Sequence, residues 1–104
     1  MEYKIKINPL AQEDLKEIKE YISLDDPATA NRLILNLLSS IEKLAQFPNM
    51  GKELRHKINI TTKYRYIIVN NYMIFYLVKN NDILINRVLN SVRDYKSLFN
   101  NKLN

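Results

Sequence analysis

The chain has 104 residues, no cysteine, one histidine and a formal net charge of +5. This length predicts one domain over residues 1–104 with a single hydrophobic core, and the lack of cysteine excludes a disulfide framework and a thiolate nucleophile. A single histidine excludes a metal site built from several histidines, so we expect neither a metal nor a cofactor. The sequence contains no long uncharged apolar run and no signal-peptide pattern, so we expect a cytoplasmic protein without membrane contact.

The first predicted element is a short strand over residues 3–7, where apolar and basic residues alternate as they do in half-buried strands. Asn8 then provides an N-cap and Pro9 the first residue of a helix, whose apolar side chains recur at spacings of three and four. We expect this helix to fade near Leu24.

A second helix is predicted to begin after Asp26, with Pro27 at its first position. Its apolar stripe is the longest in the chain, and the helix is expected to end before Phe47 because a residue that precedes a proline is disfavoured in helical geometry. Two helices joined by so short a segment should pack as an antiparallel hairpin.

The second half of the chain predicts an antiparallel meander. Its expected strands and turns are, in order, a strand at 64–69, a turn at 70–71, a strand at 72–78, a turn at 79–82 and a strand at 83–89. Residues 56–63 are ambiguous and could extend a strand, while residues 100–104 should fray. Gly51, the only glycine, is expected at a position that needs a positive φ. The predicted fold is therefore α+β, in the order β-α-α-β-β-β, with a helical hairpin packed on a small, mainly antiparallel sheet.

Charge is distributed unevenly along the chain. Residues 1–50 carry 6 basic and 8 acidic side chains, a balance of −2, whereas residues 51–104 carry 10 and 3, a balance of +7. Such asymmetry predicts a surface that meets nucleic acid or an acidic partner. The alternative is a solvated, lysine-rich face with no specific partner.

Arginine and tyrosine side chains are the best candidates for chemistry, because no P-loop, Rossmann, metalloprotease or nucleophile-elbow motif is present. Arginine binds phosphate oxygens through paired donors, and tyrosine can stack on bases or transfer a proton. The cationic candidates are Arg55, Arg65, Arg87 and Arg93, and the proton-transfer candidates are Glu53, His56, Tyr66 and Tyr95.

Several of these candidates have structural alternatives. Tyr66 could fill the core, as strand tyrosines most often do. Arg87 lies in an apolar strand, where it is either a functional group on the open face or half of an ion pair. His56 is a lone loop histidine, and Asp94 could anchor the C-terminal segment.

The chain resembles the RelE/ParE family of bacterial toxins over nearly its whole length. The resemblance rests on features in the right order, namely Ile7–Leu15, the Pro-x-x-Gly loop within Phe47–Leu54, the hairpin Tyr64–Val69 with Ile74–Tyr76, and the closing Arg87-Val88-Leu89 and Arg93-Asp94-Tyr95. Toxins of this family belong to two-gene modules in which an antitoxin wraps and neutralises the toxin. RelE-like members cut mRNA on the ribosome without metal, and ParE-like members poison DNA gyrase without being nucleases.

The sequence departs from the RNA-cutting members at two places. Met73 stands where many of them carry an arginine, and Asn90-Ser91-Val92 replaces a segment that often holds a proton-transfer residue and a cation. The resemblance leaves Glu53, Arg65, Arg93 and Tyr95 as catalytic candidates, with Arg55, Lys63 and Arg87 as candidate RNA-binding residues.

Three hypotheses remain open at this point. The first is a toxin that inhibits growth by ribosome-dependent mRNA cleavage, and the second is a ParE-type, non-enzymatic inhibitor of DNA gyrase. Both imply a cognate antitoxin as partner. The third is a small basic RNA-binding or regulatory module, which a neighbouring gene for an acidic protein would argue against.

Overall fold

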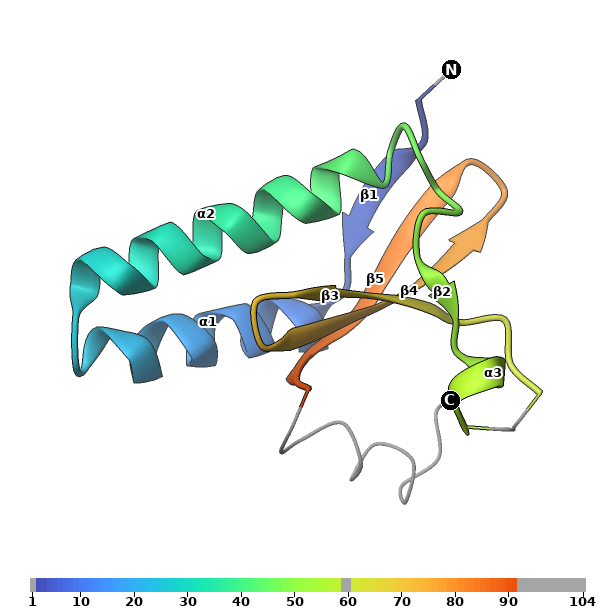
Figure 1. The fold of residues 1–104 in the computed structure, drawn as a ribbon. Coiled ribbons are helices and arrows are strands. Elements are labelled where there is room, and N and C mark those ends of the chain that lie inside the picture. Colours follow the sequence, from blue (N-terminus) through green and yellow to red (C-terminus); the bar gives the residue numbers. More distant parts are fainter. Residues whose placement is uncertain (1, 59–60, 92–104) are drawn as a thin grey trace.

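The computed structural model describes residues 2–58 and 61–91 of the chain (Figure 1). Its elements are, in chain order, β1 (Lys4–Ile7), α1 (Pro9–Ser23), α2 (Pro27–Lys43), β2 (Lys52–Glu53), α3 (Arg55–Ile58), β3 (Arg65–Val69), β4 (Tyr72–Lys79) and β5 (Asp82–Asn90). The α+β class and the predicted order are confirmed, with the short β2 and α3 added between the helical hairpin and the meander. None of the described helices is both long and apolar enough to cross a membrane.

The two long helices begin at the predicted caps. The side chain of Asn8 accepts a hydrogen bond from the backbone N–H of Ala11 at 2.8 Å, and the carboxylate of Asp26 accepts one from Ala28 at 3.1 Å. These bonds satisfy N–H groups that have no partner inside a helix. The helices lie side by side as a hairpin (Figure 1), and α2 ends at Lys43, before Phe47 as expected.

The sheet has the strand order β1-β5-β4-β3-β2, in which β1 runs parallel to β5 and every other pair is antiparallel. Asn70 and Asn80 adopt left-handed φ angles of 55° and 57° at the two hairpin turns, as expected of asparagine in such positions. In the ambiguous stretch 56–63, the first residues form the end of α3 rather than a strand extension.

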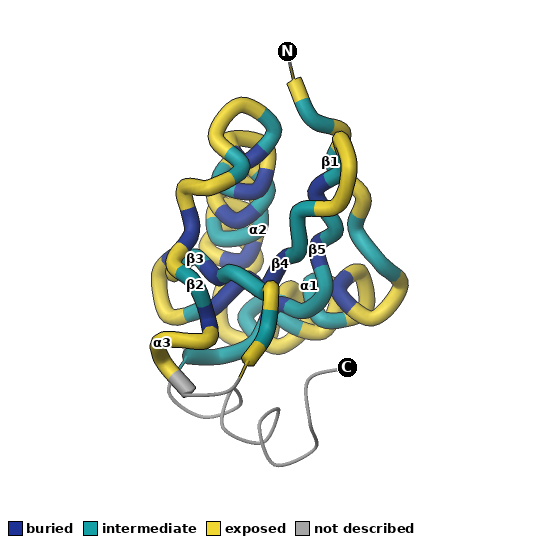
Figure 2. Tube along the Cα trace, turned by 90° about the vertical axis from the view of Figure 1, so that its right-hand side faces the viewer, coloured by how far each residue is buried: buried dark blue, intermediate teal, exposed yellow. Residues whose placement is uncertain are grey.

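The central strand β4 is buried on both faces. Ile74 and Tyr76 belong to the main core with the helical hairpin, whereas Met73 and Phe75 pack in a second cluster with Leu54 and Tyr66. This alternation follows from the two-residue period of a strand. Figure 2 shows buried residues in α2 and in the central strands β4 and β5. Because both faces are covered, β4 forms the buried centre of the sheet, between the β1 and β2 edges.

Candidate functional site at the β2–α3 end of the sheet

Tyr76 fixes the loop that leads into β2. Its ring is fully buried, its hydroxyl accepts a hydrogen bond from the N–H of Gly51 at 2.8 Å, and the same hydroxyl donates to the carbonyl oxygen of Pro48 at 2.8 Å. Burial raises the pKa of Tyr76, so the hydroxyl keeps its proton at neutral pH and can donate. One buried side chain therefore ties the Pro-x-x-Gly loop to the centre of the sheet.

Gly51 is required for space rather than for backbone conformation. Its φ is not positive, so the prediction from the sequence was wrong on this point. A Cβ atom at this position would lie 2.5 Å from the Tyr76 hydroxyl oxygen and 2.8 Å from the carbonyl oxygen of Tyr66. The glycine allows the loop to approach β3 and β4 closely enough for the Tyr76 hydrogen bonds to form.

The short edge strand β2 brings several candidate residues together. It pairs with β3 so that Glu53 lies opposite Arg65. Arg65 Nη1 donates to the carbonyl oxygen of Gly51 at 2.8 Å, while Glu53 Oε2 lies 2.8 Å from Arg55 Nε and 3.9 Å from His56 Nε2. Four residues singled out from the sequence, Glu53, Arg55, His56 and Arg65, thus meet at one end of the sheet.

Two shallow hollows flank this group and share Glu53 and Arg65. One, of about 510 Å³, is also lined by Lys52, His56 and Lys57. The other, of about 570 Å³, continues past Arg55 to Lys63, a predicted RNA-binding residue. Within residues 2–58 and 61–91, no group of three or more histidine, cysteine, aspartate or glutamate side chains is arranged to hold a metal. The arrangement is suited to binding an anion through guanidinium and ammonium groups.

Tyr66 packs in the second cluster, and its ring is not open to solvent. It is 7% exposed, lies 6.5 Å from Phe75 between ring centroids, and has the ammonium nitrogen of Lys57 at 5.8 Å from its own ring centre. The structural alternative for Tyr66 is therefore confirmed. Sequence reasoning missed Lys52 and Lys57, although both lie in the basic run that follows Gly51.

Arg87 lies away from this group, on the far side of the sheet centre. Its Nε and Nη2 atoms donate to the two carboxylate oxygens of Asp14 at 2.8 and 3.0 Å, and the same carboxylate accepts the backbone N–H of Val88 at 2.9 Å. The hydrogen bond to Asp14 raises the pKa of Arg87. The ion-pair alternative for Arg87 is confirmed, and its proposed contact with RNA stays a prediction.

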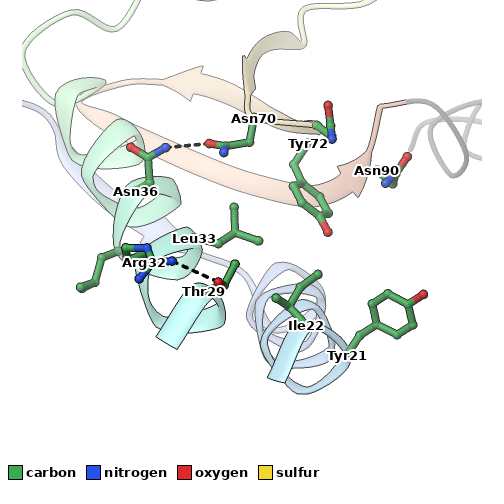
Figure 3. A pocket seen from close by; sticks show the side chains of 11 residues that line it. Tyr21, Ile22, Thr29, Arg32, Leu33, Asn36, Asn70, Tyr72 and Asn90 are labelled. Carbon is green, nitrogen blue, oxygen red and sulfur yellow. Dashed lines mark hydrogen bonds between the residues drawn. The ribbon is translucent and has the colours of Figure 1, made fainter. Parts of the chain in front are cut away.

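The two departures from the RNA-cutting pattern occupy different environments. Met73 is 1% exposed in the second cluster, so no cation could replace it without disrupting packing. Asn90 instead lines an open groove of about 940 Å³ between the helical hairpin and the β3–β4 turn. Across that groove Asn36 Nδ2 donates to Asn70 Oδ1 at 2.7 Å (Figure 3). Arg93, Asp94 and Tyr95 lie outside the described residues, as does the tail 100–104.

Solved structures place this architecture in the RelE/ParE class of folds. A chain of the chromosomal ParDE toxin–antitoxin system from P. aeruginosa matches with a TM-score of 0.71 at 21% identity, covering 85% of this chain and 95% of that one. A chain of the toxin–antitoxin complex RelBE2 from Mycobacterium tuberculosis matches with a TM-score of 0.56 at 18% identity, covering 86% and 99%. At 21% and 18% sequence identity, these structural matches establish the fold of the chain.

The family follows from the sequence itself. The model of the ParE toxin of the type II toxin–antitoxin system parDE matches residues 5–95. The chain therefore belongs to the ParE toxin family of type II toxin–antitoxin systems. No curated protein matches it significantly in sequence.

Proposed function

We propose that the protein is the toxin of a type II module that arrests growth by inhibiting DNA gyrase through binding, without cutting RNA. The observation that carries this proposal is the burial of Met73 at 1% exposure, at the position where many RNA-cutting members carry an arginine. In addition, Arg87 is paired with Asp14, so this arginine of the meander is engaged within the fold. Membership in the ParE family supports the same target.

Ribosome-dependent mRNA cleavage is the second candidate, and one observation favours it. Glu53, His56 and Arg65 lie together beside a hollow that could receive a phosphate. Cleavage needs a base, an acid and fixed cations around the phosphate. The carboxylate of Glu53, however, already accepts a hydrogen bond from Arg55, and Arg65 already donates to the Gly51 carbonyl. Two of the three candidates are therefore engaged in contacts within the fold.

A cognate antitoxin is the second partner that we propose. The matched ParDE and RelBE2 structures are of toxin–antitoxin systems, which supports an antitoxin for this chain. We expect an acidic, amphipathic segment that folds as it binds and covers part of the sheet and helices. Complementary charge accelerates encounter more than it adds affinity, so the association rate should fall as salt rises. An association rate independent of salt would count against this mode of binding.

Brief induction in cells distinguishes the two modes of action. Plasmid topology and mRNA ends, the latter by primer extension, are measured in the same culture before growth stops. Gyrase inhibition predicts relaxed or broken plasmid DNA with intact mRNA, and co-expression of the antitoxin should restore both growth and supercoiling. New codon-spaced mRNA ends with unchanged supercoiling would replace this proposal with ribosome-dependent cleavage.

A further inference from the structure

Basic side chains gather around the two hollows at the β2–α3 end. The five that border them, Lys52, Arg55, Lys57, Lys63 and Arg65, are called the basic end below. The only carboxylate in either lining is that of Glu53, and it is bound to Arg55 at 2.8 Å. Lys52, Lys63 and Arg65 form no ion pair with any carboxylate of the described residues.

An anionic partner is expected because no carboxylate of residues 2–58 and 61–91 pairs with Lys52, Lys63 or Arg65. Burying or holding several like charges together is unfavourable, and a surface of this kind attracts polyanions through the summed field. Lys52 and Lys63 are exposed, and Arg65 keeps its remaining guanidinium donors after bonding to Gly51. These three cations are thus available to phosphate groups along one edge of the sheet.

The linings of the hollows distinguish among polyanions. Single-stranded RNA is bound largely by stacking of bases on open aromatic rings. Of the two tyrosines in these linings, Tyr66 is 7% exposed beneath Lys57 and Tyr64 is partly buried against the second cluster, so the imidazole of His56 is the one well-exposed ring in the linings. An acidic peptide that folds on binding needs apolar surface to offset its ordering, yet neither lining contains an aliphatic residue such as leucine, isoleucine, valine or methionine. Duplex DNA needs neither, since its backbone is bound by charge alone.

We propose that the basic end binds the phosphodiester backbone of duplex DNA, independently of base sequence. This inference rests on the proposed function for its context, because DNA gyrase acts on duplex DNA. Contact with both partners would tether the toxin to gyrase molecules that are engaged on DNA. The binding by the toxin alone is expected to be weak, in the range of non-specific association at roughly 10⁻⁴–10⁻⁶ M.

The salt dependence of DNA binding tests the proposal. Fluorescence anisotropy of a short labelled duplex, with purified toxin and no gyrase, should give a slope of log K against log salt of roughly −3, because each phosphate contact contributes about −0.9. Lys52→Gln combined with Lys63→Gln should remove about two units of that slope. The matched control, Lys16→Gln with Lys19→Gln on the exposed face of α1, removes the same charge and should leave the slope unchanged.

A change of opposite sign provides an independent check. Glu53→Gln removes the carboxylate that neutralises Arg55, so DNA affinity should rise and the slope should steepen by about 0.9. Circular dichroism confirms folding for each variant.

Four results would overturn the proposal. These are no DNA binding by the parent at low salt, equal losses in the Lys52/Lys63 and Lys16/Lys19 variants, tighter binding of single-stranded RNA than of duplex DNA, and displacement of DNA by polyglutamate at equal charge concentration. The outcome is separate from that of the proposed function. Gyrase inhibition without DNA binding would remove this inference alone, whereas DNA binding without gyrase inhibition would remove the proposed target and leave the binding surface.

Discussion

Arg87 and Arg65 lie on strands of the same sheet and looked alike in the sequence, yet their surroundings differ. Arg87 lies beyond the end of β1, where two of its guanidinium nitrogens donate to Asp14, and that carboxylate is only 11% exposed. Arg65 lies beside β2, where one nitrogen donates to the Gly51 carbonyl and no carboxylate of the described residues pairs with it. At the β1 edge, the charge of Arg87 is neutralised by Asp14. The β2 edge keeps a net positive charge.

This difference shows what each edge contributes. The carboxylate of Asp14 takes the place of a further β1 residue, because it accepts the N–H of Val88 where the parallel pairing has ended. An unpaired N–H there would have cost free energy on folding. At the other edge, β2 has only two residues. The basic side chains there remain accessible to solvent, and the Tyr76 hydrogen bonds hold the loop that leads into β2.

The largest loss of stability is expected when the contact between Asp14 and Arg87 is removed. Asp14→Ala leaves the guanidinium of Arg87 and the N–H of Val88 without their partner, and should lower the free energy of unfolding by about 3 kcal/mol. The matched control is Glu53→Ala, which removes a carboxylate from an exposed pair and should cost below about 1 kcal/mol. Urea unfolding of both variants measures the difference. Equal losses would mean that the two edges are not distinct in stability.

A smaller loss of stability is expected when the Tyr76 hydrogen bonds to the loop before β2 are removed. Tyr76→Phe removes the acceptor for Gly51 N–H and the donor to Pro48, and should cost about 2 kcal/mol since unsatisfied buried groups cost about 1–3 kcal/mol each. Tyr21→Phe is the control, because Tyr21 is 64% exposed. Thermal unfolding compares the two. A Tyr76→Phe variant as stable as the control would show that the hydroxyl does not hold the loop.

The smallest effect is expected from the exposed cap of α2. Hydrogen bonds from Thr29 and then from the Ala28 N–H lower the pKa of Asp26 below its ordinary value of 3.8. The folded state therefore binds this proton less readily than the unfolded state, so the contribution is complete above about pH 3.8 and is lost as the pH falls through the lowered value. The melting-temperature difference between the parent and Asp26→Asn, whose cap does not titrate, should be constant near neutrality and change only in acid. A difference that changes between pH 5 and pH 7 would contradict this assignment.

The fold was largely predictable because its signals are local. Asn8 and Asp26 cap helices through residues two or three positions away, and Asn70 occupies a turn that asparagine favours. The roles of Asp14, Gly51 and Tyr76 were not predictable in the same way. Each depends on a partner many positions distant, such as Asp14 on Arg87 or Tyr76 on Gly51, and neither spacing nor composition encodes such contacts.

The candidate site was predictable in part. Glu53, Arg55, His56 and Arg65 were singled out by residue type, and the pairing of β2 with β3 brings them together. The sequence left the role of Arg87 open because a strand arginine can face solvent or an acid on another element. Only the packing of α1 against β5 brings Asp14 within hydrogen-bonding distance.

A supercoiling assay with purified DNA gyrase tests the central claim most directly. Increasing toxin is added to gyrase, ATP and relaxed plasmid, and a parallel reaction contains programmed ribosomes and mRNA. The account predicts that supercoiling is lost in proportion to toxin, that purified antitoxin restores it, and that the mRNA stays intact. Unimpaired supercoiling together with cleaved mRNA would contradict it.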